Sequence, residues 1–229
     1  MRFSCLLLVV LFLAGCTERP ASEQPSEPTE PTASEDTPLP DGFEMLGRAT
    51  GNLDDDPDDE VVVVFNTPDE GDLGTARELR IYQVDADGWT LWHTSTNPIL
   101  SSESGGMMGD PFESVAIERG AIVVKHFGGS RAKWAYTHRY RWQDDAWRLI
   151  GATSEAGAPC ETIDTFDYNV ATGTAAFVQE AETCDGDTMT RSETTRQTIS
   201  MPQDPLPTMD AFEPGVNLAA IPGGYEVYY

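Results

Sequence analysis

Residues 134–142 read WAYTHRYRW, and this stretch decides the fold class of the chain. Rings stand at every second position, and they belong to Trp134, Tyr136, His138, Tyr140 and Trp142. Successive side chains of a β-strand point to opposite faces, so the alternation predicts a strand with Arg139 and Arg141 on the face away from the rings. The ring face is interpreted as a core face packed against a second layer, and stacking of the rings on a sugar or peptide is the alternative.

Similar segments, of period two or continuously apolar, recur on both sides of this strand. They cover residues 60–66, 78–84, 89–95, 112–118, 121–127, 146–152, 174–180 and 189–200. Turn residues mark the tips between them, at Asp87-Gly88, Arg119-Gly120, Gln143-Asp144-Asp145 and Thr172-Gly173. Only residues 42–49 suggest a helical period. We therefore predict a mainly β fold, an antiparallel sheet or sandwich-like single domain, followed by a proline-rich strap that ends in a short strand near residues 226–229.

The chain is strongly acidic. Its 229 residues include 14 Lys and Arg against 39 Asp and Glu, which gives a formal net charge of −25. This charge argues against nucleic acid as a partner and favours solubility and the binding of cations. An acidic surface also suits a salty habitat, which is the alternative explanation of the composition.

The N-terminus has the layout of a secretory signal. Arg2 precedes the apolar run 3–13, which is too short to span a bilayer as a permanent helix. The run leads into Leu13-Ala14-Gly15-Cys16, and this ending resembles the bacterial lipoprotein signal. The resemblance implies that residues 1–15 are removed and that Cys16 is acylated, for example with palmitate, and holds the protein to a membrane. Thr17 follows the cysteine in place of Asp, which implies the outer membrane and its periplasm as the location.

Residues 16–40 are predicted to be the lipidated cysteine and a disordered tether, which leaves 41–229 as the β-rich domain. After Cys16 the tether holds six prolines, six acids and one large apolar residue. Such a segment cannot bury enough apolar surface to offset the ordering of its chain. In an extended polyproline conformation it would reach on the order of 75 Å.

The four cysteines divide into three groups. Cys5 lies in the signal and Cys16 takes the lipid, so Cys160 and Cys184 remain in an exported, oxidising compartment. We predict one disulfide between them. A pair of free or metal-binding thiols is the alternative, but no Cys-x-x-Cys pattern supports it.

An acidic loop directly precedes the valine-rich strand 60–66. Residues 51–60 read GNLDDDPDDE, and oxygen ligands at alternate positions of such a loop can surround a hard cation. The predicted ligands of a calcium ion are the side chains of Asn52, Asp54 and Asp56, the carbonyl of Asp58, and Glu60. A solvated acidic turn without metal is the alternative.

This loop resembles the Asp-rich loop of FG-GAP/VCBS-type β-repeats, the calcium-binding units of integrin-type propellers. The resemblance implies calcium as the cofactor. The sequence departs from the family pattern at Asn52, at Pro57, where the family has Gly, and at Glu60. The resemblance covers about fifteen residues, and the chain has one copy, so we do not expect a full propeller.

A glycine-rich and aromatic segment in the middle of the chain offers a candidate ligand site. Its residues are Asp110, His126, Gly128, Gly129, Ser130 and Trp134. The arrangement over residues 50–151 is similar to a group of bacterial exported proteins without an assigned activity. Backbone amides at 128–130 could hold an anion, although a tight β-turn is the simpler interpretation. His126 could be a ligand or base, although a single histidine at a strand end is more often structural.

Half of the basic residues fall within residues 119–148. They are Arg119, Lys125, Arg131, Lys133, Arg139, Arg141 and Arg148. This group could pair with acidic neighbours, or it could receive an anionic glycan or peptide.

Together these features favour a lipid-anchored binding or structural protein of the cell envelope, with an envelope protein or glycan as its partner. An assembly lipoprotein that contacts a protein through its aromatic face is a second form of this hypothesis. The chain has no Gly-x-Ser-x-Gly or His-Glu-x-x-His motif, so no catalytic residue is assigned. The alternative is an envelope hydrolase acting on glycan or peptide through Asp110, Glu113 and His126.

Overall fold

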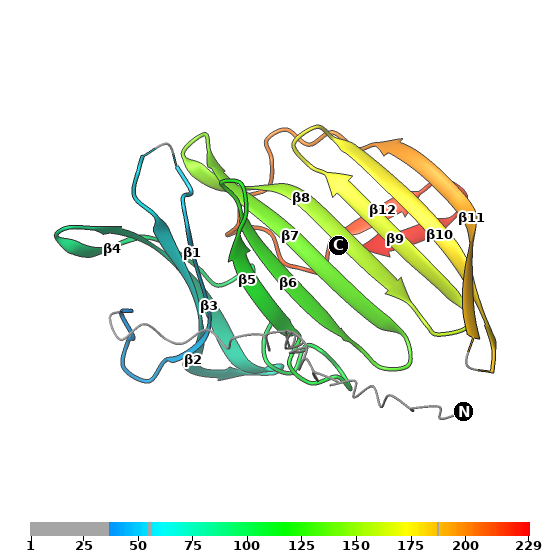
Figure 1. Ribbon diagram of the computed structural model, residues 1–229, viewed down its shortest axis with the longest axis horizontal. Coiled ribbons are helices and arrows are strands. Elements are labelled where there is room, and N and C mark those ends of the chain that lie inside the picture. The colour runs from blue at the N-terminus through cyan, green and yellow to red at the C-terminus, as the bar shows by residue number, and fades with distance from the viewer. Residues whose placement is uncertain (1–36, 55, 187) are drawn as a thin grey trace, which may run out of the picture. The chain divides into compact units, whose positions relative to one another are not determined.

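A computed structural model describes residues 37–54, 56–186 and 188–229, and within these ranges the chain is all β. The strands form antiparallel sheets that stay open, which confirms the predicted fold class and the absence of a full propeller (Figure 1). The predicted signal, Cys16 and most of the tether lie outside the described residues. Within the described part, the chain has no helix that is both long and apolar enough to cross a bilayer.

The first sheet has four strands in chain order. They are β1 (Glu44–Gly51), β2 (Glu60–Gly71), β3 (Gly74–Asp85) and β4 (Gly88–Ser95). The valine run of β2 is buried on both faces: Val62 and Val64 join the main core, while Val61 and Val63 join a smaller cluster on the other side. A continuous apolar strand suits such a position, because both of its faces exclude water.

The second sheet is a seven-stranded meander, in which every strand pairs with its neighbours in sequence (Figure 1). Its strands are β5 (Phe112–Ile117), β6 (Ile122–Gly129), β7 (Lys133–Gln143), β8 (Ala146–Gly157), β9 (Thr162–Asn169), β10 (Thr174–Asp185) and β11 (Thr188–Ser200). β11 forms an edge of the sheet and is mostly exposed. The hairpin tip at Arg119-Gly120 is confirmed, with φ values of 52° and 71° that fit a primed two-residue turn.

The C-terminal segment covers part of one face of this sheet. It runs as a strap without regular pairing to β12 (Leu218–Ile221) and β13 (Tyr225–Tyr228), which form a two-stranded sheet behind β9 and β10 in Figure 1. We call the covered face the inner face and the face toward the viewer of Figure 1 the outer face. Phe212 and Tyr229 place their rings against those of Tyr140 and Phe166, so the strap and its hairpin complete the core.

The alternation of β7 is confirmed. His138 and Tyr140 are fully buried on the inner face, whereas Arg141 is exposed on the outer face. Trp134 and Tyr136 also lie on the inner face but are only half-buried. The strand therefore serves as a core element at one end and as a surface element at the other.

The suggested helical period at residues 42–49 is wrong, because β1 occupies this segment. A bulge between Met45 and Gly47 breaks the alternation that would have identified a strand. Gly47 and Gly51 also allow β5 to cross closely, since a Cβ on either would meet Phe112 or Ile117 at 3.0 Å. β9 and β12 were not predicted, and β13 matches the short strand expected near the C-terminus.

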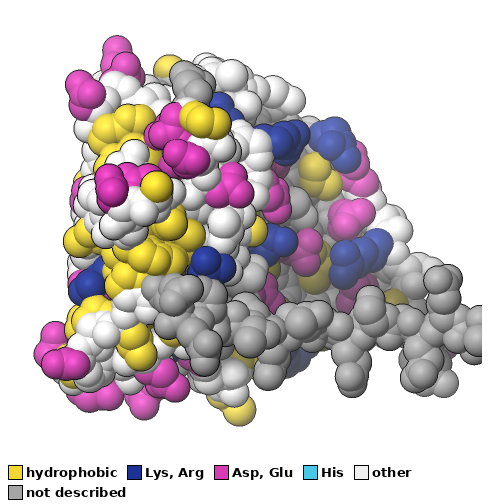
Figure 2. Space-filling model, turned by 60° about the vertical axis from the view of Figure 1, so that its left-hand side comes forward, with side chains coloured by type: hydrophobic (Ala, Val, Ile, Leu, Met, Phe, Trp, Pro, Cys, Tyr) yellow, Lys and Arg dark blue, Asp and Glu magenta, His cyan; other side chains and the backbone are white. Residues whose placement is uncertain are grey.

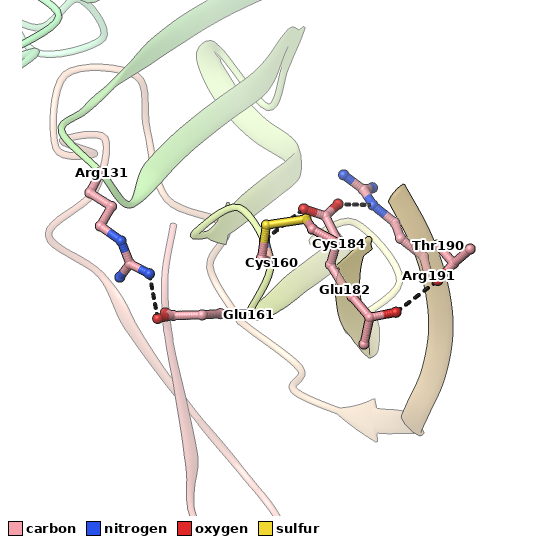
Figure 3. Close-up of a disulfide and its surroundings, with 8 residues drawn as sticks. Arg131, Cys160, Glu161, Glu182, Cys184, Thr190 and Arg191 are labelled. Atoms are coloured by element: carbon pink, nitrogen blue, oxygen red, sulfur yellow. Dashed lines mark hydrogen bonds and ion pairs between the residues drawn. A yellow bond between two sulfur atoms is a disulfide. The ribbon is translucent and has the colours of Figure 1, made fainter. Parts of the chain in front are cut away.

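The predicted disulfide between Cys160 and Cys184 is confirmed. It joins the turn between β8 and β9 to the end of β10, across a sequence separation of 24 residues (Figure 3). The buried carboxylate of Glu182 lies beside it, accepting from the Cys160 amide at 3.0 Å and from Arg191 Nε at 2.8 Å. These two hydrogen bonds hold the pKa of Glu182 below its usual range.

Replacing both cysteines (Cys160→Ser, Cys184→Ser) should lower the free energy of unfolding by about 3 kcal/mol, because the unfolded chain regains the freedom of the closed loop. Urea denaturation followed by tryptophan fluorescence measures this change. The single variant Cys160→Ser should lose about as much as the double variant, since either change removes the cross-link. Unchanged stability in the double variant would show that the cross-link does not restrict the unfolded chain.

Candidate functional site

The acidic loop between β1 and β2 brings three carboxylates together. Ligand oxygens of Asp54, Asp56 and Glu60 all lie within 4.8 Å of one another, so this cluster could hold a metal ion. The chain curls in this way because Asp54 Oδ1 accepts from the Asp56 amide and Asp56 Oδ1 accepts from the Asp58 amide, both at 2.9 Å. Such Asx turns are typical of aspartates two residues apart in a loop.

Glu60 is the buried member of this cluster, with 1% of its surface exposed. Its Oε2 accepts from the Leu53 amide at 2.6 Å, and within the described residues no Lys or Arg forms an ion pair with this carboxylate. Burial, and then the carboxylates of Asp54 and Asp56, raise the pKa of Glu60 above its usual value. A bound cation would reverse both effects, since it favours the charged forms of all three groups.

The two remaining predicted ligands contact each other. Asn52 Nδ2 donates to the carbonyl oxygen of Asp58 at 3.2 Å and also to that of Asp56. The side-chain nitrogen of Asn52 therefore holds the two ends of the loop together by donating hydrogen bonds to its carbonyls. For Asn52 to act as a metal ligand, its side-chain amide would have to turn so that Oδ1 faces the ion.

The other predicted site residues fall into two groups, and the first lies around the buried Arg77, next to the start of β5. Arg77 of β3, whose side chain is 0% exposed, donates to both oxygens of Asp110 at 3.1 and 2.6 Å. Asp110 also accepts from the Phe112 amide, so its carboxylate fixes the start of β5. His126 is fully buried nearby, and its Nε2 accepts from the Leu100 amide at 3.2 Å. Asp110 and His126 therefore come together around Arg77, with His126 buried and the Asp110 side chain 44% exposed.

The glycine-rich turn holds the second group. The amides of Gly129 and Ser130 already donate to the carbonyls of Gly105 and Ala132, so they are not available to an anion. Gly128 has a different role, because a Cβ at this position would meet the ring of Trp134 at 2.3 Å. The missing side chain lets the indole of Trp134 lie across the neighbouring strand.

Trp134 and Tyr136 line a large cavity on the inner face. Their rings stack with centroids 4.7 Å apart and an angle of 23° between the planes. The cavity measures about 660 Å³ and is bounded by three further segments: the loop before β5, the strap and the β2–β3 turn. We call it the inner cavity. Its lining includes Leu73, Asn97, Ile99, Glu103, Glu213 and Val216 together with the two rings.

A smaller cavity of about 260 Å³ lies along the same two rings, toward β13. Tyr228 and Glu226 line it opposite Ser154 of β8. The ring pair thus lines two adjacent cavities.

The alternation of β7 identified these two rings from the sequence. The strap and the loop before β5 carry no strand pattern, so their part in the inner cavity could not be predicted. The Pro214-Gly215 pair gave the one local signal, and Gly215 does lie against the ring of Tyr136.

Two buried histidines lie deeper on the inner face. His138 packs against Phe212 with ring centroids 4.8 Å apart, and neither of its ring nitrogens has a hydrogen-bond partner within the described part of the chain. Burial lowers the pKa of His138 to about 3, helped by the charges of His126 and Arg139. Burial, with a smaller effect of Arg77, lowers the pKa of His126 to about 4, against an opposing effect of Asp110. Both histidines are therefore neutral in the folded protein at pH 7.

Comparison of the chain with protein families, with curated proteins and with solved structures found no match.

His138 should make the protein less stable as the pH falls from about 6.5 to about 3. The unfolded chain takes up a proton near pH 6.5, while the folded chain keeps His138 neutral, so unfolding becomes more favourable in this window. In His138→Phe the slope of unfolding free energy against pH should fall by up to about 1.4 kcal/mol per pH unit. Urea denaturation across this range measures both slopes.

The two proteins carry the same carboxyl groups, so the difference between the slopes reports His138 together with its effect on the neighbouring His126. Equal slopes in the wild type and the variant would mean that His138 is protonated in the folded state.

Proposed function

We propose that this chain is a lipid-anchored binding protein of the bacterial cell envelope, held at the outer membrane through Cys16. Its ligand, an envelope protein or glycan, would occupy the inner cavity, and the acidic loop would be closed by a calcium ion. The stacked pair of Trp134 and Tyr136 in the inner cavity is the observation that carries the binding part of this proposal.

Several properties of the inner cavity support a ligand site. Its volume of about 660 Å³ falls within the range of small-molecule and cofactor sites. Leu73 and Val216 at its rim are 57% and 58% exposed, so the rim offers apolar surface to a ligand. Asn97 and Glu103 add groups that can hydrogen-bond to a polar ligand. Aromatic rings with polar neighbours suit both sugars and peptides.

The acidic loop supports calcium over a softer metal. Its three converging side chains are all carboxylates, and calcium takes six to eight oxygen ligands. The buried carboxylate of Glu60 provides a fixed ligand, while the more exposed Asp54 and Asp56 can adjust to the ion. The resemblance to the FG-GAP/VCBS loop points to the same ion, which would here stabilise the start of β2.

Calcium should raise the melting temperature of the protein. At a concentration about a hundred times its Kd, the ion should add about 2.7 kcal/mol to the free energy of unfolding. Glu60→Gln should abolish this calcium-dependent gain, because it removes the buried charge of the cluster. Differential scanning calorimetry in calcium and in chelator measures both effects.

Asp59→Asn is the matched control, since Asp59 is an exposed acid of the same loop that does not belong to the three-carboxylate cluster. It should keep the calcium response. An unchanged melting temperature, with no metal found by elemental analysis, would contradict the calcium site while leaving the inner cavity as a separate question.

Site-specific photocrosslinking in intact cells tests the binding role. A photoreactive residue at Val216, at the rim of the inner cavity, should form a defined adduct with an envelope protein or glycan, and Trp134→Ala should abolish it because the stacking surface is lost. The same probe at Leu91 is the control, since Leu91 is 50% exposed and does not line the inner cavity. Adducts that persist with Trp134→Ala would contradict the proposed site.

Cys16→Ser should release the protein from the membrane fraction, because the residue that would carry the lipid is lost. Fractionation of the cells measures this, and retention of the variant in the membrane fraction would contradict the anchor.

A further inference from the structure

The outer face of the seven-stranded sheet carries basic side chains without carboxylate partners. Within the described ranges, Arg119, Arg139 and Arg141 take part in no ion pair, whereas Arg131 and Arg191 each do. Figure 2 shows several Lys and Arg side chains on its right-hand half, interspersed with Asp and Glu side chains. In a chain with a net charge of −25, three neighbouring arginines without an ion-pair partner form a local excess of positive charge.

These three arginines line a single hollow of about 610 Å³. We call it the outer cavity. Gly151 of β8 lies in its lining, directly opposite Arg139 of β7. A Cβ at Gly151 would meet nothing closer than Arg139 Cδ at 3.7 Å, so the missing side chain leaves space on the sheet surface beside the guanidinium. The outer cavity lies on the opposite face of the sheet from the inner cavity.

The arginines are held by the chain itself. Arg141 Nη2 donates to the carbonyl of Arg119 at 3.1 Å, and Arg141 Nε donates to that of Gly120 at 3.4 Å, which fastens the β5–β6 turn. Arg119 has a φ of 52°, a conformation that Gly or Asn adopts at lower cost. The β5–β6 turn therefore holds Arg119 beside the outer cavity.

Arg139 is oriented by a hydrogen-bonded chain. Its Nη1 donates to Thr153 Oγ1 at 3.4 Å, and Thr153 in turn donates to Asp167 Oδ1 at 3.1 Å. The remaining N–H groups of Arg139 have no partner in the described part of the protein. Hydroxyl and amide groups of Thr165 and Asn169 complete the polar lining. The outer cavity therefore combines free guanidinium donors with groups that bind hydroxyls.

The net charge of the residues that line the outer cavity matches a ligand with a single negative charge. Its lining holds the three arginines against the two acids Glu118 and Asp167, which leaves one positive charge in excess. A carboxylate matches this balance and accepts two parallel N–H bonds from a guanidinium. A phosphate dianion would remain partly uncompensated and would face two carboxylates.

We propose that the outer cavity binds a carboxylated sugar unit of a glycan. The carboxylate lies on Arg139 and Arg141, and the sugar hydroxyls bind Thr153, Asp167 and Asn169. This site is independent of the proposed role of the inner cavity, because the two cavities open on opposite faces of the sheet.

Isothermal titration of the full chain with a short oligogalacturonate tests the proposal. The oligogalacturonate should bind, and its uncharged methyl ester should bind at least about tenfold more weakly, as expected for loss of a charge-assisted hydrogen-bond pair. Arg139→Gln should weaken oligogalacturonate binding by a similar factor. Lys125→Gln is the matched control, since Lys125 is an exposed cation of the same face that does not line the outer cavity, and it should leave the Kd unchanged.

Gly151→Val provides a second variant that should keep the fold, because a Cβ at Gly151 would lie at ordinary contact distance from Arg139, 3.7 Å, and the φ of Gly151 is ordinary. The valine should narrow the outer cavity beside Arg139 and weaken binding without removing a charge. Absence of oligogalacturonate binding, equal affinity for the methyl ester, or an unchanged Kd in both Arg139→Gln and Gly151→Val would overturn the proposal. Tighter binding of inorganic phosphate or of a polyglutamate peptide would overturn the assignment to a sugar.

Discussion

The burial of the inner face of the seven-stranded sheet is the interaction on which the rest of the structure depends. This face carries rings from β7, β9 and β10, and it is covered by elements far away in sequence, chiefly the strap and the β12–β13 hairpin. Phe212 is central to this contact, because its ring packs against His138, Tyr140 and Tyr229. At the other end of β7 the strap and β13 cover the sheet incompletely, so Trp134 and Tyr136 remain half-buried and line a cavity.

The same geometry separates two kinds of surface. Period-two alternation sends the rings of β7 inward, so the positions between them face away from the core and can carry charge. Arg139 and Arg141 occupy those positions, and no element of the described chain pairs them with an acid. One strand thus supplies an aromatic lining on one side of the sheet and a basic lining on the other.

Sequence patterns identified the strands whose alternation is unbroken and failed where the alternation stops. β7 and β2 were evident from their ring and valine patterns. β9 was not, because its buried residues Ile163, Phe166 and Tyr168 are spaced by three and then by two positions. The bulge in β1 hid that strand in the same way. Period-two arguments need a regular register, which bulges and irregular burial remove.

The candidate sites were predictable to the extent that they are local. Asp54, Asp56 and Glu60 could be grouped from their spacing alone, because one loop holds them all. The disulfide followed from elimination among four cysteines. By contrast, the ion pair of Arg77 with Asp110 joins β3 to the loop before β5, and the inner cavity joins four separate segments. No local pattern encodes such long-range neighbours, so Asp110 and His126 were candidates for a ligand site although the fold uses Asp110 as the partner of a buried arginine and His126 as an interior contact.

The exposed edge at β11 affects how copies of this protein can coexist. A free edge presents unpaired backbone groups that can pair with another chain, and confinement to a membrane surface would bring such edges close together. β11 carries Arg191, Glu193 and Arg196 along this edge, and the last two form an ion pair. Two antiparallel copies would have to place these charges side by side and give up their water, so the edge resists aggregation through its own sequence.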